Sequence, residues 1–256
     1  MNSAMLIKTL ENWQLEDPGV QILQCGSSVN NPSARDIDII IYTCDDLDCY
    51  FTGLLSKFGN NDKIRKRYID VWNMYSLKIT ENGEELSFHI VSCQDLKRYI
   101  GRADEVEIYT DINLFALSMN LPTVYRKWIT DTHHLLGDVR LKKELESMLK
   151  QHTMPVTAIQ DLLRKRILNS INYYHEKDDS ALFSGIIVSQ IFNDLALYCY
   201  AGNHMFYGTL KYLESDLRSF ENDSELSRQG IELFQSINQE DPENIGKRLY
   251  RIQSLL

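Results

Sequence analysis

The spacing of hydrophobic residues changes once along the chain, and this change limits the fold more than any other feature of the sequence. Before residue 122, short runs rich in β-branched residues are separated by turn signals, which is typical of strands. After it, apolar residues recur every three or four positions over long segments, which is typical of helices. The sequence therefore predicts an α+β protein with a small mixed-sheet domain over residues 1–121 and an α-helical domain over 122–256.

The elements expected in the first domain follow from this pattern. Asn82-Gly83 lies between two strand-like runs and is a strong hairpin signal. The expected elements are a helix over 3–13, strands over 20–25 and 36–42, a helix over 45–58, and the hairpin strands 74–80 and 85–92. In the second domain, helices are expected over 141–150, 156–174, 181–200, 205–220, 226–237 and 245–256.

Composition and charge exclude several classes of protein. With 256 residues, 43% of them hydrophobic, the chain can bury a substantial core. The 27 basic and 36 acidic residues give a net charge of −9, which disfavours a protein that binds mainly by neutralising nucleic-acid phosphates. Two basic runs, residues 63–67 (KIRKR) and 164–166 (RKR), are interpreted as solvated helix faces.

The sequence also bears on location. It contains no run of about 20 apolar residues and no N-terminal signal peptide, so we expect no membrane partner and a cytoplasmic location. Its five cysteines are scattered and form no disulfide framework, so reduced and mostly buried thiols are expected.

Two short polar motifs accompany the first two predicted strands. Gly26-Ser27-Ser28 leaves the strand over 20–25, where backbone N–H groups and hydroxyls can hold an anion such as a phosphate. Asp36 and Asp38 alternate with isoleucines in the next strand, so both carboxylates point to the same face. Two neighbouring carboxylates repel each other unless a cation lies between them, and oxygen ligands suit Mg²⁺ or Mn²⁺. Either motif alone is common by chance, whereas their order around two strands is much more specific.

This order of strand, Gly26-Ser27, spacer and Asp36-Ile37-Asp38-Ile39 resembles the signature of the DNA polymerase β-like nucleotidyltransferase superfamily, over about residues 3–118. A small catalytic domain followed by helices is most similar to the aminoglycoside and lincosamide nucleotidyltransferases. The resemblance implies transfer of a nucleoside monophosphate, AMP by preference, from an NTP to an acceptor hydroxyl. It implies Mg²⁺ held by the two aspartates, and nucleotide binding by Gly26, Ser27, Ser28 and Arg35.

One residue departs from the family pattern. The family has a third acidic residue on a later strand, and the matching position here, in Leu86-Ser87-Phe88-His89-Ile90-Val91, is His89. A neutral imidazole can bind a divalent metal or accept a proton, although it suits Mg²⁺ less well than Mn²⁺. In the alternative, His89 is a hydrogen-bonded core residue and the third acid is Asp70, Glu84 or Glu85.

The helical domain offers one further group. If a single helix continues through Gly202, then Tyr200, His204, Tyr207 and Lys211 fall on one stripe. The resemblance implies that Lys211 binds the triphosphate, and Tyr207 is placed with it as a nucleotide-binding residue because its ring can stack on a base. In the alternative, Lys211 pairs with Glu214 or Asp216 on an exposed face.

The resulting hypothesis is a metal-dependent nucleotidyltransferase with a small-molecule hydroxyl acceptor and ATP as the expected donor. Asp36, Asp38 and His89 are the expected catalytic and metal-binding residues. Two alternatives remain: an enzyme that modifies tRNA or another RNA, docked through residues 63–67, and a noncatalytic nucleotide-binding regulator.

Overall fold

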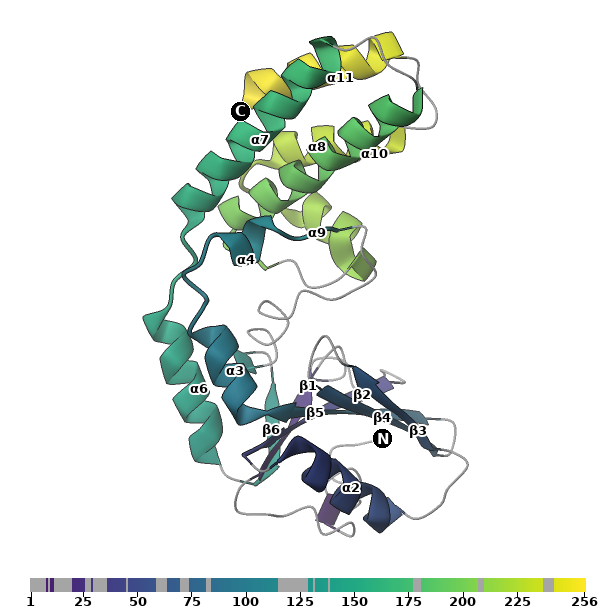
Figure 1. Cartoon of the computed structure of the whole chain (residues 1–256), viewed down its shortest axis with the longest axis vertical. Helices are drawn as coiled ribbons and strands as arrows, with labels where there is room; N and C mark the ends of the chain where they lie inside the picture. Colours follow the sequence, from purple (N-terminus) through teal and green to yellow (C-terminus); the bar gives the residue numbers. More distant parts are fainter. Residues whose placement is uncertain are drawn as a thin grey trace. The chain divides into compact units, whose positions relative to one another are not determined.

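The computed structural model describes residues 8, 10–11, 20–25, 29, 36–44, 46–58, 64–69, 74–81, 84–114, 129–130, 132–137, 139–176, 181–206, 210–236 and 242–256 (Figure 1). The chain forms two compact units, Met1–Arg102 with Tyr125–His152, and Ala103–Val124 with Thr153–Leu256. The predicted α+β class, a small mixed sheet followed by a helical region, is confirmed. The division by contacts is discontinuous in sequence, whereas the sequence predicted a single boundary after residue 121.

The first unit is built on a sheet whose six described strands follow the order β3-β4-β5-β2-β1-β6. The strands are β1 (Val20–Cys25), β2 (Asp36–Thr43), β3 (Ile64–Ile69), β4 (Met74–Glu81), β5 (Glu84–Ser92) and β6 (His133–Gly137). β2 and β5 run parallel, and the other neighbouring pairs are antiparallel. β2 and β5 are therefore central strands with a partner on each side.

One face of this sheet is apolar and is covered by α2 (Leu47–Phe58) (Figure 1). Alternate residues in the middle of β2 and β5, such as Ile39 and Phe88, are buried in the cluster that also contains Leu47 and Phe51 of α2. The ring of Phe51 stacks on Tyr75 of β4, with centroids 3.9 Å apart. Because successive residues of a strand point to opposite faces, the residues between Ile37, Ile39 and Ile41 are directed away from α2.

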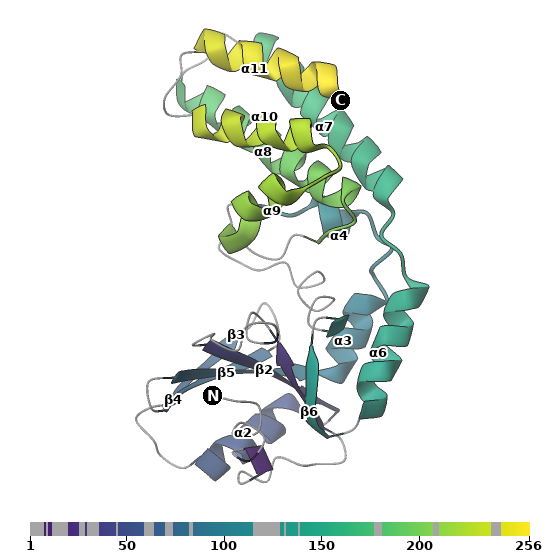
Figure 2. The same cartoon turned by 180° about the vertical axis from the view of Figure 1, so that it is seen from behind.

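Two helices complete the first unit beside the sheet (Figure 2). α3 (Cys93–Ile100) begins directly after β5, and α6 (Val139–Gln151) follows β6. They pack on each other and are joined by an ion pair in which Lys97 Nζ lies 2.6 Å from Glu144 Oε1. α3 thus links the carboxyl end of β5 to α6.

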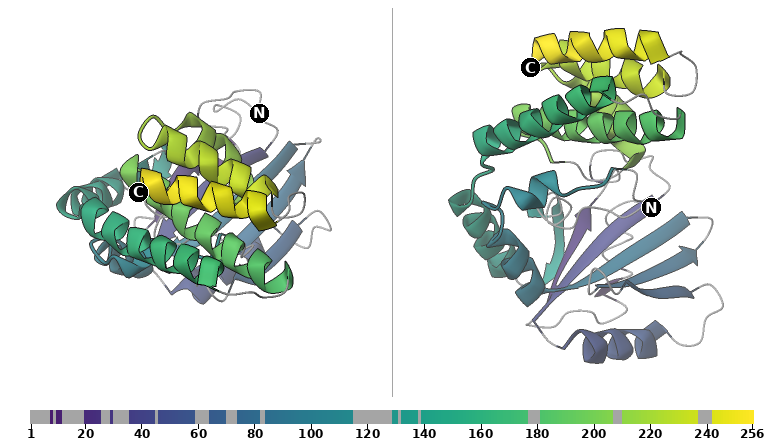
Figure 3. Two further views of the ribbon diagram at one scale, coloured as in Figure 1. Left: turned by 90° about the horizontal axis from the view of Figure 1, so that it is seen from above. Right: turned by 45° about the horizontal axis from the view of Figure 1, so that its top comes forward.

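The second unit is helical, with a hairpin of two long helices at its centre (Figure 3). Its elements are α4 (Glu107–Thr110), α7 (Val156–Glu176), α8 (Ala181–Gly202), the short 3₁₀ helix η3 (Leu210–Tyr212), α9 (Leu213–Ser219), α10 (Ser224–Ser236) and α11 (Pro242–Leu255). α8 packs against α7, α9 and α10, which explains why it is apolar around most of its circumference. Gly230 of α10 allows the close approach, since a Cβ there would lie 2.6 Å from the Leu195 side chain.

A short segment of this unit is held by the side chain of one buried asparagine. Asn193 of α8 accepts a hydrogen bond from the backbone N–H of Leu114 (2.8 Å) and donates one to the carbonyl of Ile112 (3.0 Å). Arg166 of α7 donates to the carbonyl of Thr110 (2.9 Å) and to the Asp111 carboxylate (3.1 Å). Residues 110–114 are therefore fastened to both long helices by side-chain contacts.

Several elements differ from the sequence predictions. Residues 64–69 form β3 rather than a helix face, and β6 lies where only helices were expected. Arg166, from the run 164–166, binds the backbone instead of lying free in solvent. Within the described residues, none of the helices has the length and apolar character needed to cross a membrane.

Candidate functional site

Asp38 lies on the face of the sheet opposite α2, at the first half of the central strand β2. Its neighbours Ile37 and Ile39 are buried against α2, so alternation directs Asp38 the other way. The Asp38 side chain retains 36% of its exposure, which leaves the carboxylate accessible to a ligand. Asp36 lies two residues earlier on the same strand, and its side chain is outside the described part of the structure.

His89 of β5 approaches Asp38 from the neighbouring parallel strand. The register pairs Asp38 with Ser87 and Ile40 with His89, so Asp38, Ser87 and His89 share one face. His89 Nε2 lies 3.8 Å from Asp38 Oδ1, and the imidazole is only 16% exposed. The structure thus brings together two of the three residues expected to bind metal, although their sequence separation is large.

The two residues that pair with Asp38 on the neighbouring strands are small and uncharged. Cys25 of β1 pairs with Asp38 on the antiparallel side, and Ser87 pairs with it on the parallel side; both are buried. Burial, together with the negative charge of Asp38, raises the pKa of the Cys25 thiol well above its ordinary value. Cys25 is therefore a neutral neighbour, and a cation bound here would be balanced by Asp38 and other carboxylates. Sequence reasoning overlooked Cys25, because its pairing with Asp38 depends on strand register.

The alternatives for a third acid are placed only in part. Glu85 occupies the register position next to Asp36 on the parallel strand, and Glu84 precedes it; neither side chain is described. Asp70 lies outside the described residues. The described residues alone contain no group of three His, Cys, Asp or Glu side chains arranged to hold a metal ion.

The predicted nucleotide-binding residues fall largely where the structure gives no description. Gly26, Ser27, Ser28, Arg35 and Tyr207 lie outside the described residues. Lys211 has a described backbone, in η3, but no described side chain. Their roles stay predictions.

The predicted helical stripe through Gly202 is wrong, because α8 ends there. His204 adopts a left-handed conformation (φ 53°), its N–H binds the carbonyl of Ala201 (2.9 Å), and the N–H of Met205 binds that of Tyr200 (2.9 Å). These two bonds form a Schellman motif, which satisfies the last carbonyls of a helix and turns the chain away. Lys211 therefore does not continue the helical face of Tyr200.

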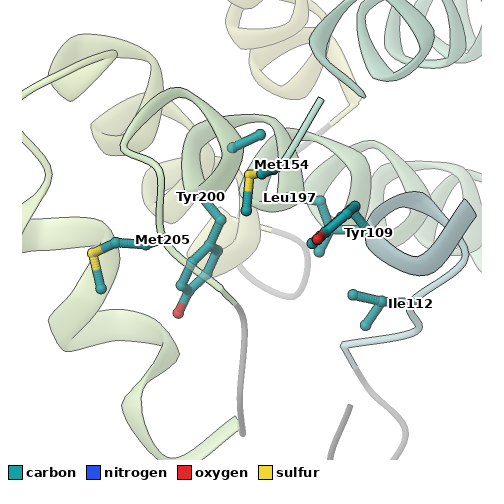
Figure 4. A pocket seen from close by; sticks show the side chains of 7 residues that line it. Tyr109, Ile112, Met154, Leu197, Tyr200 and Met205 are labelled. Carbon is teal, nitrogen blue, oxygen red and sulfur yellow. The ribbon is translucent and has the colours of Figure 1, made fainter. Parts of the chain in front are cut away.

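The end of α8 contributes to a small apolar pocket in the second unit (Figure 4). It is lined by Tyr109, Ile112, Met154, Leu197, Tyr200, Ala201 and Met205. The free volume of about 10 Å³ accommodates roughly one water molecule, which is far less than a nucleobase needs. Tyr200 is bound to Asp216 through its hydroxyl (2.7 Å) and has a structural role here.

No family model and no curated protein matches the sequence. Among solved structures, the chain is similar to a crystal structure described as a nucleotidyltransferase-like protein from Exiguobacterium sibiricum 255-15, with 13% identity and a TM-score of 0.37. The match covers 99% of this chain and 73% of the other. At this identity and TM-score, the likeness assigns no activity to the present chain.

Proposed function

We propose that the protein is a metal-dependent nucleotidyltransferase that moves a nucleoside monophosphate from an NTP to a hydroxyl of a small molecule and releases pyrophosphate. The observation that carries the proposal is the pairing of Asp38 with His89 on adjacent parallel strands, 3.8 Å apart. Asp38 is accessible and belongs to an Asp-x-Asp strand that follows Gly26-Ser27. The motif and this geometry together favour phosphoryl-group chemistry over a purely structural role.

The donor atoms fit a divalent cation. Two ligands at about 2.1 Å from a metal, in neighbouring octahedral positions, lie about 3 Å apart. Asp38 Oδ1 and His89 Nε2 are 3.8 Å apart. A small side-chain rotation that moves one of these atoms by less than about 1 Å would bring them to that separation. Mg²⁺ or Mn²⁺ bound there, with Asp36 as a further ligand, would neutralise the charge that develops on the transferred phosphoryl group.

The chain's own residues have two separable tasks in this proposal. Asp36 and Asp38 hold the cation and thereby position the triphosphate, which Gly26 and Ser27 contact. His89 either completes the ligand set or takes the proton from the acceptor hydroxyl while its oxygen attacks the α-phosphorus and pyrophosphate leaves. Substitution of His89 by Asp separates these tasks, because a carboxylate restores the usual third ligand of the resembled family. Metal binding through His89 predicts that the His89→Asp variant gains activity with Mg²⁺ relative to Mn²⁺.

The test is pyrophosphate release from each of the four NTPs, with Mg²⁺ or Mn²⁺, in the presence of pooled small hydroxyl acceptors or tRNA. Asp38→Asn should abolish acceptor-dependent release, while Asp161→Asn, at an exposed position of α7, should leave it unchanged. His133→Ala, at an exposed position of β6, is the matched control for His89→Ala. Full activity of Asp38→Asn would refute the assignment.

The same assay separates the two alternatives. Release that depends on tRNA, with binding that weakens steeply as salt rises, would favour an RNA-modifying enzyme. Metal-dependent NTP binding by calorimetry, with no pyrophosphate released for any acceptor, would favour a noncatalytic nucleotide-binding protein.

A further inference from the structure

Two cysteines directly follow the paired strands β2 and β5, at the carboxyl ends of these strands. Thr43 and Ser92 are partners in the parallel register, and Cys44 and Cys93 are the residues that follow them. Neighbouring strands lie about 4.8 Å apart, so the last paired residues, Thr43 and Ser92, lie within the Cα separation of about 4.4–6.8 Å that a disulfide spans, and the cysteines are the next residues along each chain segment. The Cys44 thiol lies close enough to Cys93 to act on its thiol through a hydrogen bond and through charge.

The two cysteines differ in their surroundings. Cys44 is exposed, whereas Cys93, the first residue of α3, is 2% exposed. Burial, followed by the hydrogen bond with Cys44, raises the pKa of the Cys93 thiol well above its ordinary value, and the ammonium of Lys97 opposes this shift. An oxidant in solution therefore meets Cys44 first, and Cys93 lies behind it as a protonated thiol.

We propose that Cys44 and Cys93 are a redox-active pair that a peroxide converts into an intramolecular disulfide. Cys44 loses its proton to solvent, the thiolate attacks one peroxide oxygen, the O–O bond breaks, and Cys44 becomes a sulfenic acid while the leaving hydroxide takes a proton from solvent and becomes water. The Cys93 sulfur then attacks Cys44 Sγ, the S–O bond breaks, and the departing hydroxide takes the Cys93 proton as a second water. Two thiols are oxidised by two electrons, and one peroxide is reduced to two waters.

The remaining thiols do not compete on equal terms. Cys25 and Cys199 are buried. Cys49 is exposed, but its backbone N–H binds the carboxylate of Asp46, the helix cap of α2, at 2.9 Å. A separate hydrogen bond between the Cys49 thiol and the Asp46 carboxylate, together with the negative charge of Asp46, raises the pKa of the Cys49 thiol, which lowers its thiolate fraction at neutral pH. Oxidation should therefore select Cys44.

The test treats the purified full chain with hydrogen peroxide and maps the tryptic peptides without reduction. Cys44 and Cys49 share the peptide 36–57, and Cys93 lies in 79–97. We expect these two peptides to be joined within a monomer, the thiol count of the denatured chain to fall from five to three, and dithiothreitol to restore it. The oxidised chain should also melt about 5 °C or more above the reduced chain, since the crosslink closes a long loop.

Matched serine variants decide which thiols take part. Cys49→Ser should still join the two peptides, and Cys44→Ser, at an exposed position that leaves the core intact, should not. The proposal is overturned by a link between Cys44 and Cys49 inside peptide 36–57, by sulfinic or sulfonic acid on Cys44 with Cys93 still free, by disulfides only between chains, or by an unchanged thiol count. None of these outcomes depends on the activity proposed for Asp38 and His89.

Discussion

Replacement of Asn193 by alanine should loosen the segment 110–114 and destabilise the helical unit. The Asn193 side chain is 5% exposed, and its amide satisfies the buried N–H of Leu114 and the carbonyl of Ile112. Alanine cannot make either bond, and a buried polar group without a partner costs about 1–3 kcal/mol. The loss of both bonds should lower the free energy of unfolding by about 2–5 kcal/mol. A typical domain has a free energy of unfolding of about 5–15 kcal/mol, so this loss is a large part of the total.

Urea unfolding followed by circular dichroism at a helix-sensitive wavelength measures this loss. With a slope of about 2 kcal/mol per molar urea, a loss of about 3 kcal/mol moves the midpoint down by about 1.5 M. Amide hydrogen exchange adds a local measurement, because Leu114 should exchange faster in Asn193→Ala than in the wild type. Asn169→Ala, at an exposed position of α7, should shift the midpoint little. A midpoint shift below about 0.5 M with unchanged protection at Leu114 would refute the reasoning.

Three further variants test other parts of the fold. Burial raises the pKa of the Asp194 carboxyl, so the folded state holds this proton more tightly than the unfolded state does. The stability of the wild type should therefore fall as pH rises from the ordinary aspartate pKa of about 3.9 through the raised pKa of the folded state. Asp194→Asn should remove this component and be more stable at neutral pH, by about 1.4 kcal/mol for each unit of pKa separation, as measured by thermal melts across pH. Gly137→Ala should weaken the pairing of β6 with β1, because φ is +89° and a Cβ would lie 2.1 Å from the carbonyl oxygen of Val20; unaltered melting would contradict this. His204→Gly should stabilise the helical unit by about 1 kcal/mol, since glycine adopts the left-handed conformation of that helix end without strain, and a lower melting temperature would count against the Schellman motif.

The central strands were predictable because their signals are local. Alternation in Asp36-Ile37-Asp38-Ile39 predicted both the strand and the shared face of the aspartates, and Asn82-Gly83 predicted that the strands on either side form a hairpin. The strand appears as β2, and the predicted hairpin appears as the antiparallel pair β4 and β5. The position of His89 between the apolar residues Phe88 and Ile90 of its strand was also predictable from the sequence.

The elements that were missed depend on distant partners or on special turns. β6 forms by pairing with β1, and its Gln21–His134 contact joins residues 113 positions apart. Because the partner strand is so distant in sequence, the residues around 133 carry no local strand signal. β3 carries residues 64–67 of the basic run at the edge of the sheet, where charged residues are common and resemble a solvated helix face. The end of α8 depends on the left-handed conformation of His204. A glycine at that position would have indicated such a helix end, and histidine does not. The approach of His89 to Asp38 likewise required the parallel register of β2 and β5, which the sequence does not encode locally.

The most direct test of the central claim follows a label from the α-phosphate of an NTP onto an acceptor, in wild type and in Asp38→Asn. The proposed function predicts that, with Mg²⁺ or Mn²⁺ present, wild type moves the label to one acceptor pool and releases unlabelled pyrophosphate, while Asp38→Asn moves none and melts at the same temperature. Label transfer that survives in Asp38→Asn, or that needs no divalent metal, would contradict the claim that Asp38 holds the reacting nucleotide through a cation.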